Sequence, residues 1–518
     1  MNQIFRNLLR PLAHRSVTSH QRIFCILNSH DNPSDAWKSL LVTPPTNNTA
    51  EFWSNVKQTI LATNRNAKKA NVDGIILNHL CANKNIETAK LFVESMQKNG
   101  EKLNPLIKGI MLKLYYHATH HKDYVLTEDD KSRIIEIYRE LKQNYDTFDS
   151  TTCENLILGL SLTSAWKEGI QLLEDAKLTA IPGRFTYTAL ITSALKNEEP
   201  STFFRLLDEM IGHEQQPTSQ IYNTWIDWCK NMADFEKIFR FLEDMGLHMP
   251  LDSAEKLIKK MSSMKITAQK VRVTKYGNCS GCKKSLDTTA LTIDEFNNVR
   301  DAFLSKVIVK NNIFLNTNPE ELQAFKNFLE ENGPYDCVVD GLNVAYSKGN
   351  KGAVAQANLL LQVVTELTKI HKNILVLGKK HMIKWPAQQM KRLRMIADTF
   401  FTADISQDDP FLLYATLKSG PEARFCSRDL MRQHAFLLGP ELRICFFKWR
   451  DQRQYKLKSS FKVLFDKPCL YKGTAHKIDN VWHIPFVEDE RTWLNEYVPT
   501  DEKQWMCIQL KNSNKKII

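Results

Sequence analysis

Between residues 70 and 260, apolar positions recur with the period of amphipathic helices, and short polar turns divide these helices into pairs. The second helix of each pair closes on a phrase of acidic and apolar residues, and these phrases end at Met96, Leu141, Ala176, Met210 and Met245. The successive spacings are 45, 35, 34 and 35 residues, so one longer insertion interrupts a regular repeat. Single helix pairs cannot bury their apolar faces, and the pattern therefore predicts a stacked α-solenoid.

The first helices of the pairs repeat as well. Tyr187-Thr-Ala-Leu-Ile and Tyr222-Asn-Thr-Trp-Ile lie one repeat apart, and Cys153-Glu-Asn-Leu-Ile lies one repeat earlier. A helix pair of this length and wording resembles the pentatricopeptide repeat, a family that binds RNA along the surface lined by the first helices. The alternative is a tetratricopeptide-type array that binds protein. The Tyr-x-x-Leu-Ile opening and the Glu-Asp-Met ending favour the pentatricopeptide pattern and an RNA ligand.

The pattern changes after residue 318 to short, β-branched apolar runs that alternate with helical stretches. Helices are expected over residues 320–332, 353–371 and 411–418, and strands over residues 335–340, 373–378, 399–402 and 423–428. Strands that alternate with helices predict a mostly parallel sheet with helices on both faces.

Four carboxylates stand near the ends of the predicted strands: Asp340, the adjacent Asp408 and Asp409, and Asp429. The crevice of an open α/β sheet lies outside the carboxyl ends of its strands, so these acids are candidates for one site. Carboxylates without a neighbouring catalytic Ser, Cys or His pattern are ligands for Mg²⁺. The alternative is structural: Asp408 and Asp409 would interact with the positive end of a helix, and Asp340-Gly341 would be a turn.

Cys279 and Cys282 form a Cys-x-x-Cys pair, which is half of a tetrahedral zinc site. The chain has no second pair of this kind, so the other ligands must come from far away, or the pair is redox-active. His483 and Cys507 lie on short aromatic-rich segments near the C-terminus and are candidates for the missing ligands. The 11 cysteines are scattered along a long chain and do not indicate a disulfide framework.

The amino-acid composition favours a polyanionic binding partner. Lys and Arg number 70 against 58 Asp and Glu, which gives a net charge of +12. Residues 1–30 contain several arginines and no acid, and an apolar helical face, as in a mitochondrial transit peptide. The alternative for this segment is a disordered basic tail. No apolar run reaches the length that spans a bilayer, so an integral membrane protein is not expected.

In combination, these features resemble the protein-only RNase P family, and in particular its animal mitochondrial members. The resemblance rests on the repeats, the Cys-x-x-Cys connector and the phrases Val339-Asp-Gly-Leu-Asn-Val, Asp408-Asp-Pro-Phe-Leu-Leu-Tyr-Ala, Ser427-Arg-Asp-Leu-Met-Arg-Gln-His and Trp482-His-Ile-Pro. It implies that the catalytic metal, Mg²⁺ or Mn²⁺, binds Asp340, Asp408, Asp409 and Asp429. It also implies that a structural Zn²⁺ binds Cys279, Cys282, His483 and Cys507.

The resemblance implies a multidomain fold that combines α and α/β parts. The expected parts are a transit peptide (1–30), a linker (31–50), a pentatricopeptide-repeat solenoid (51–262), a bipartite zinc connector (263–290 with 473–518) and an α/β NYN (PIN-like) metallonuclease domain (291–472). The zinc would clamp the segment that leaves the repeats to the C-terminal tail.

The activity implied by the resemblance is that of an endoribonuclease. It would remove the 5′ leader from precursor tRNAs in the mitochondrial matrix by metal-dependent hydrolysis and leave a 5′-phosphate on the mature tRNA. The resemblance also implies a tRNA methyltransferase and a short-chain dehydrogenase as partner subunits. The alternative is a non-catalytic pentatricopeptide RNA-binding factor that acts in RNA processing or stability, but the complete set of four acids favours an enzyme.

Overall fold

The computed structural model describes residues 36–39, 41, 48–119, 124–213, 215–305, 319–403, 409–429, 431–458, 464–465, 470–488 and 504–510. The predicted transit peptide and Asp408 lie outside these residues. The chain forms two compact units, Met1–His213 and Glu214–Ile518. Among the described helices, none combines the length and the apolar character needed to cross a membrane.

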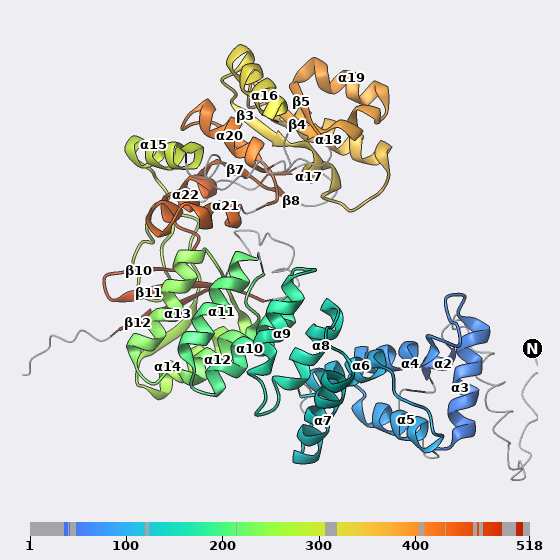
Figure 1. The fold of residues 1–518 in the computed structure, drawn as a ribbon. Helices are drawn as coiled ribbons and strands as arrows, with labels where there is room; N and C mark the ends of the chain where they lie inside the picture. The colour runs from blue at the N-terminus through green and yellow to red at the C-terminus, as the bar shows by residue number, and fades with distance from the viewer. Residues whose placement is uncertain are drawn as a thin grey trace, which may run out of the picture. The chain divides into compact units, whose positions relative to one another are not determined.

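The first unit is built from stacked helix pairs (Figure 1). After α2 (Ala36–Ser39) and α3 (Ala50–Thr63), the pairs are α4 (Val72–Ala82) with α5 (Ile86–Lys98), α6 (Pro105–Ala118) with α7 (Glu128–Asn144), α8 (Ser150–Leu160) with α9 (Glu168–Lys177), and α10 (Arg184–Lys196) with α11 (Pro200–Gly212). The first helices of successive pairs pack on one another. The predicted helical repeat is confirmed, and its longer spacing comes from the connection between α6 and α7.

One buried carboxylate illustrates how neighbouring pairs are joined. Thr127 and Asp130 form a capping box at the start of α7, and each backbone N–H donates to the other residue's side chain at 3.1 Å. The same carboxylate accepts a hydrogen bond from Tyr124 at 2.7 Å and pairs with Lys90 of α5 at 2.8 Å. Burial opposes the charge of Asp130, but these partners outweigh burial and lower the pKa of Asp130 to about 2.

The second unit begins with the last repeat, α12 (Ser219–Trp228) and α13 (Met232–Met245), followed by α14 (Leu251–Ser263). Helix α13 ends at Met245 and is capped by Gly246, whose φ of 60° is left-handed. A Cβ at this position would lie 2.8 Å from the ring of Phe447, so glycine is required both by the backbone and by the close packing.

A mixed sheet follows, with strand order β1 (Met249–Pro250), β11 (Val481–Val487), β12 (Gln504–Gln509) and β2 (Thr267–Val271), and β10 (His476–Ile478) also pairs with β11. Strand β1 is parallel to β11, and the other pairs are antiparallel. Beyond β2 the backbone turns back at Gly277 (φ 85°), which brings Cys279 opposite Val273. The segment that leaves the repeats is therefore paired directly with the C-terminal strands.

The rest of the second unit is an α/β domain with a five-stranded parallel sheet of order β5 (Asp398–Thr402), β4 (Ile374–Lys379), β3 (Cys337–Asp340), β6 (Arg424–Cys426) and β7 (Gln454–Tyr455). The other elements are α15 (Ile293–Ala302), α16 (Pro319–Asn332), α17 (Gly341–Tyr346), α18 (Ala353–Leu367), η3 (Lys380–Lys384), α19 (Ala387–Ile396), α20 (Asp409–Ser419), α21 (Arg432–Leu437), α22 (Pro440–Arg453) and the short pair β8 (Leu457–Lys458) and β9 (Leu464–Phe465). The predicted parallel α/β architecture is confirmed.

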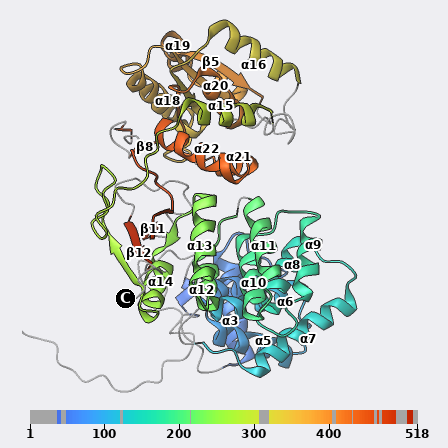
Figure 2. The same cartoon turned by 90° about the vertical axis from the view of Figure 1, so that its left-hand side faces the viewer.

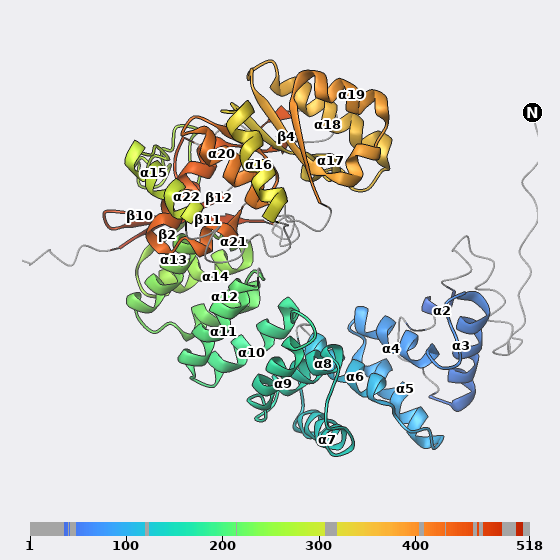
Figure 3. The same ribbon diagram turned by 45° about the horizontal axis from the view of Figure 1, so that its top comes forward.

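Helices cover both faces of this sheet (Figures 2 and 3). Val338 packs into the core with α15, α16, α20 and α22, whereas its neighbours Cys337 and Val339 pack into the core with α18 and α19. The alternation follows from the two-residue period of a strand that is buried on both sides.

A buried arginine links the last repeat to the α/β domain. Arg443 of α22 donates to the carbonyl of Asp244 at the end of α13 at 3.2 Å, and to the carbonyl of Phe436 in α21 at 3.0 Å. Helix α21 begins at Arg432, three residues after Asp429, so the hydrogen bonds of Arg443 connect the end of the repeats to the helix that follows a candidate catalytic acid.

Candidate functional site

The strand order of the α/β domain defines a crevice. The chain proceeds from β3 through β4 to β5 on one side, and then returns to β6 and β7 on the other side of β3. The switch point therefore lies between β3 and β6, and the crevice outside the carboxyl ends of these strands is where such sheets bind ligands. Asp340 is the last residue of β3, and Asp429 lies three residues after the end of β6.

Asp340 is buried at the point where β3 meets α17. Its carboxylate caps α17 by accepting a hydrogen bond from the backbone N–H of Asn343 at 3.0 Å. Its other oxygen accepts a hydrogen bond from the Ser427 hydroxyl at 3.2 Å. Gly341 is required here, because a Cβ would lie 2.6 Å from the carbonyl oxygen of Leu377 in the adjacent strand.

Ser427 and Gln454 position the segment that carries Asp429. The Ser427 oxygen accepts a hydrogen bond from the backbone N–H of Asp429 at 3.1 Å, so one side chain contacts both Asp340 and the Asp429 backbone. The buried amide of Gln454 donates to the carbonyls of Ser427 at 2.9 Å and of Asp429 at 2.6 Å. The carboxylate of Asp429 accepts from the backbone N–H of Met431 at 2.5 Å.

Hydrogen bonds of Asn343 and Arg428 form a second connection across the crevice. The Asn343 side chain accepts from the backbone N–H of Arg428 at 2.9 Å, and the Arg428 guanidinium donates to the carbonyl of Ser347 at 3.0 Å. The candidate acids Asp340 and Asp429 are therefore held by a hydrogen-bond network that joins α17 to the end of β6.

Asp409 is the first residue of α20, which packs against β3 and β6. Its neighbour Asp408 lies outside the described residues. Within the described part of the chain, Asp340, Asp409 and Asp429 are not gathered as tightly as the Cys and His side chains discussed below. The structure thus brings Asp340 and Asp429 to one edge and begins a helix at Asp409.

His434 of α21 is a buried residue near Asp429, although its sequence pattern indicates only a helix residue. Burial lowers the pKa of His434 to about 4, and the charge of Asp429 opposes this shift only partly. The imidazole is therefore neutral at pH 7. Sequence reasoning assigned no role to Ser427, Gln454 or Asn343. Only the position of Ser427, two residues before an acid, offers a local signal of its role.

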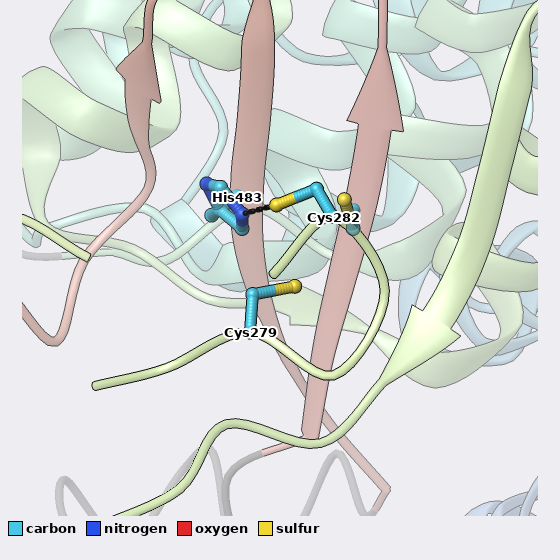
Figure 4. Close-up of side chains that lie close together, drawn as sticks. Cys279, Cys282 and His483 are labelled. Carbon is cyan, nitrogen blue, oxygen red and sulfur yellow. Dashed lines mark hydrogen bonds between the residues drawn. The ribbon is translucent and has the colours of Figure 1, made fainter. Parts of the chain in front are cut away.

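A second candidate site lies on the mixed sheet. Cys279, Cys282, His483 and Cys507 come from a loop, β11 and β12, and their ligand atoms all lie within 4.8 Å of one another. Figure 4 shows the Cys282 sulfur directed at the His483 ring, with Sγ and Nε2 separated by 3.2 Å, and the side chain of Cys279 beside them. His483 and Cys507 are opposite one another in the pairing of β11 with β12. Of the described residues, these form the one group of three or more potential ligands this close together.

The electrostatics of this group suit a thiophilic cation. Burial, and then the neighbouring thiols of Cys279 and Cys282, raise the pKa of the Cys507 thiol. Burial, followed by the effects of His476 and Lys284, lowers the pKa of His483 to about 4, so its imidazole is neutral and can act as a ligand. Three thiols and one imidazole are a common donor set for tetrahedral zinc, and a cation would offset the cost of ionising the buried thiols.

Comparison with known proteins gives matches along most of the chain. A family model described as protein-only RNase P matches residues 273–507, and a PPR repeat model matches residues 185–214. The chain is 31% identical to the mitochondrial ribonuclease P catalytic subunit of Mus musculus over 424 residues, which cover 78% of this chain and 70% of the mouse protein. It is 29% identical to the Rattus norvegicus protein of the same name, over 91% of this chain and 79% of that protein.

A solved structure also matches. The nuclear protein-only RNase P 2 of Arabidopsis thaliana aligns with a TM-score of 0.43 and 16% sequence identity, over 84% of this chain and 98% of that chain.

Proposed function

This chain belongs to the protein-only RNase P family, and from that premise we propose that it removes the 5′ leader of mitochondrial precursor tRNAs by phosphodiester hydrolysis. The observation that carries the proposal is the pairing of Asp340 and Asp429 through Ser427 at the switch point of the sheet. Parallel α/β sheets bind ligands at this edge, and stacked helical repeats offer an extended surface for RNA. The two parts suit an enzyme that holds a folded RNA and cuts it at one position.

The metal ligands in this proposal are Asp340, Asp408, Asp409 and Asp429. Their carboxylates are hard oxygen donors, and this donor set fits Mg²⁺ or Mn²⁺ and not a thiophilic metal. When bound, the dication would supply Lewis-acid stabilisation of charge on the scissile phosphate.

The chain's own groups orient these acids. Ser427 donates to the Asp340 carboxylate while it accepts from the Asp429 backbone, which limits how far the ends of β3 and β6 can separate. Gln454 holds the same segment through two carbonyls. His434 is neutral at pH 7 because its pKa is lowered to about 4, so it has no proton to give as an imidazolium acid.

We assign a structural Zn²⁺ to Cys279, Cys282, His483 and Cys507. Their proximity, the burial of Cys279, His483 and Cys507, and their donor chemistry support this assignment. Zinc would reinforce the pairing of β2 with β12, which already joins the segment after the repeats to the C-terminal region.

We propose that each of the expected domains has its own role. The solenoid of residues 51–262 would hold the tRNA body, the connector of residues 263–290 and 473–518 would carry the zinc, and residues 291–472 would cut. We place the enzyme in the mitochondrion, because the mammalian relatives are named as mitochondrial subunits. Within the mitochondrion, the matrix is our proposed compartment. A tRNA methyltransferase and a short-chain dehydrogenase are the proposed partner subunits.

The test is cleavage of a purified precursor tRNA with Mg²⁺, with and without the two partner proteins. We expect a 5′-phosphate on the mature tRNA and a 3′-hydroxyl on the leader, because water attacks the phosphorus and the 3′ oxygen leaves. A precursor with a 2′-deoxy sugar at the cut should still be cleaved, since that hydroxyl is not the nucleophile.

A 2′,3′-cyclic phosphate on the leader would overturn this chemistry, because it requires attack by the 2′-hydroxyl of the RNA. Binding without cleavage, in the presence of metal and both partners, would instead support the non-catalytic RNA-binding alternative.

A further inference from the structure

The segment from Lys380 to Ala397 contains several cations and no acid. It comprises η3 and α19, which connect β4 to β5. Helix α19 and both strands are labelled in Figure 1. Its exposed cations are Lys380, Lys384, Lys391, Arg392 and Arg394, here called the η3–α19 basic surface.

The charge of this surface is not neutralised within the described part of the chain. None of its five cations forms an ion pair there, and the Arg394 guanidinium lies over the ring of Phe401, 5.8 Å from the ring centroid. Some lysines of the repeats are neutralised by acids of the chain: Lys57 pairs with Asp73 at 2.9 Å and Lys177 pairs with Glu209 at 2.8 Å. Like charges three or four residues apart repel one another, so the η3–α19 basic surface gains stability when an external polyanion binds it.

This surface begins beside the candidate catalytic acids. Lys379 ends β4, two residues beyond Leu377, which is the partner of Asp340 in the β3–β4 pairing. The Met382 side chain of η3 accepts from the backbone N–H of Lys379 at 3.2 Å, and its methyl lies 3.4 Å from a Cβ placed on Gly341. The turn of η3 therefore packs against the residue that follows Asp340.

The surface also exposes apolar groups between its cations. The side chains of Ile383 and Met395 are 49% and 76% exposed. Cations interleaved with exposed apolar side chains suit a nucleic-acid strand, which offers both phosphates and base faces, better than they suit a small inorganic anion.

We propose that the η3–α19 basic surface binds the RNA phosphates that flank the scissile bond, as a second RNA-binding surface separate from the repeats. This inference rests on the proposed function, which makes RNA the polyanion at this edge of the sheet. The phosphates could belong to the leader or to the acceptor strand, and both offer the same chemistry to the cations.

The test compares two triple variants of the full-length chain with equal charge change. The first carries Lys380→Gln, Lys384→Gln and Lys391→Gln. The matched control carries Lys369→Gln, Lys372→Gln and Lys418→Gln, which are also exposed but lie where α18 and α20 lead into the amino ends of β4 and β6. Binding of a precursor tRNA is measured over a range of salt concentrations without divalent metal, and the thermal unfolding of both variants is compared with that of the wild type.

We expect the first variant to bind about tenfold more weakly and to lose about two from the slope of log K against log salt concentration, since each lost phosphate contact removes about 0.7 to 0.9. The control should keep the wild-type slope, and both variants should unfold like the wild type. An unchanged slope in the first variant, or an equal loss in the control, would overturn the proposal. Because the readout is binding, it stays informative even if the wild type does not cleave the precursor.

Two precursors distinguish the source of the phosphates. One has a long leader and the other has a leader of a single nucleotide. A loss confined to the long-leader precursor assigns the surface to the leader, and an equal loss on both assigns it to the acceptor strand. If the first variant bound each precursor as tightly as the wild type does, the surface would not contact RNA.

Discussion

At the scale of single residues, one substitution separates the two roles open to Asp409. Asp409 is the first residue of α20, and its charge interacts favourably with the positive end of the helix. In the proposed function, Asp409 also binds the catalytic metal. Asp409→Asn keeps the shape and removes the charge. We expect cleavage to fall by ~100-fold or more, with precursor binding nearly unchanged and a change in unfolding free energy below about 1 kcal/mol. Single-turnover cleavage and urea unfolding measure the two effects.

Asp294→Asn is the matched control, since Asp294 is an exposed acid in the first turn of α15. It should change stability by a similar amount and leave cleavage intact. If the two variants cleaved the precursor equally well, Asp409 would be a helix-terminal residue and not a metal ligand.

His434 makes the stability of the α/β domain depend on pH. Its folded pKa of about 4 lies below the ordinary value of 6.5, so the unfolded chain binds the proton more readily. The stabilisation that comes from the neutral, buried His434 is complete above pH 6.5 and is lost as the pH falls toward 4. The free energy of unfolding should therefore decrease by about 2 kcal/mol between pH 7 and pH 5. His434→Gln should remove this part of the pH dependence in urea unfolding without divalent metal. Identical pH dependence in the variant and the wild type would show that His434 is not buried as a neutral group.

Local sequence reveals some of these residues and hides others. Asp340 is predictable, because a β-branched run that ends in Asp-Gly indicates a buried strand with an acid at its carboxyl end. Gln454 is not predictable, and Ser427 carries only the weak local signal of a serine two residues before an acid. Their side chains act on Asp340, 87 residues away, and on the carbonyl of Ser427, 27 residues from Gln454, and no local pattern encodes such contacts.

At the scale of elements, a zinc ion held by the Cys and His group would reinforce the connection that the pairing of β2 with β12 already makes. Cys282→Ser removes one proposed zinc ligand, and we expect loss of bound zinc and a lower unfolding temperature, because structural zinc contributes directly to folding. The sheet formed by β2, β12 and β11 should limit the damage, so helical content should persist at room temperature. Metal analysis and thermal unfolding followed by circular dichroism measure these outcomes.

Cys445→Ser is the matched control. Cys445 is also half-buried, but it lies on α22 and contacts Glu295. It should retain zinc and lose little stability. Wild-type protein that is well folded and contains no zinc would contradict the assignment.

The elements differ in how well sequence predicts them. The helix pairs follow from local periodicity, and each predicted second-helix phrase, such as the one that ends at Met210, lies within a second helix. The mixed sheet is not predictable in this way, because β2 and β12 are more than 200 residues apart and short strands carry little periodic signal. For the same reason, spacing alone leaves the grouping of His483 with Cys282 as one possibility among several.

At the scale of the whole molecule, the two compact units allow the contribution of the repeats to RNA binding to be separated. A chain of residues 215–518 begins one residue inside the second unit, Glu214–Ile518, and retains the last repeat, the mixed sheet and the α/β domain. We expect it to bind precursor tRNA about a hundredfold more weakly than the full chain, with a smaller salt slope, because most phosphate contacts would be lost with residues 1–214. Circular dichroism checks that the shortened chain is folded.

The salt dependence of RNA binding by the shortened chain tests whether the η3–α19 basic surface acts independently of the repeats. If the η3–α19 basic surface binds RNA independently of the repeats, the Lys380, Lys384 and Lys391 substitutions should remove the same increment, about two, from the slope of the shortened chain as from that of the full chain. The contributions then add, as expected for contacts at separate sites on one RNA. If residues 215–518 bound the precursor as tightly as the full chain, the first unit would not hold the tRNA. A triple variant that changed only the full-length slope would mean that the repeats must first position the RNA before the basic surface can reach it.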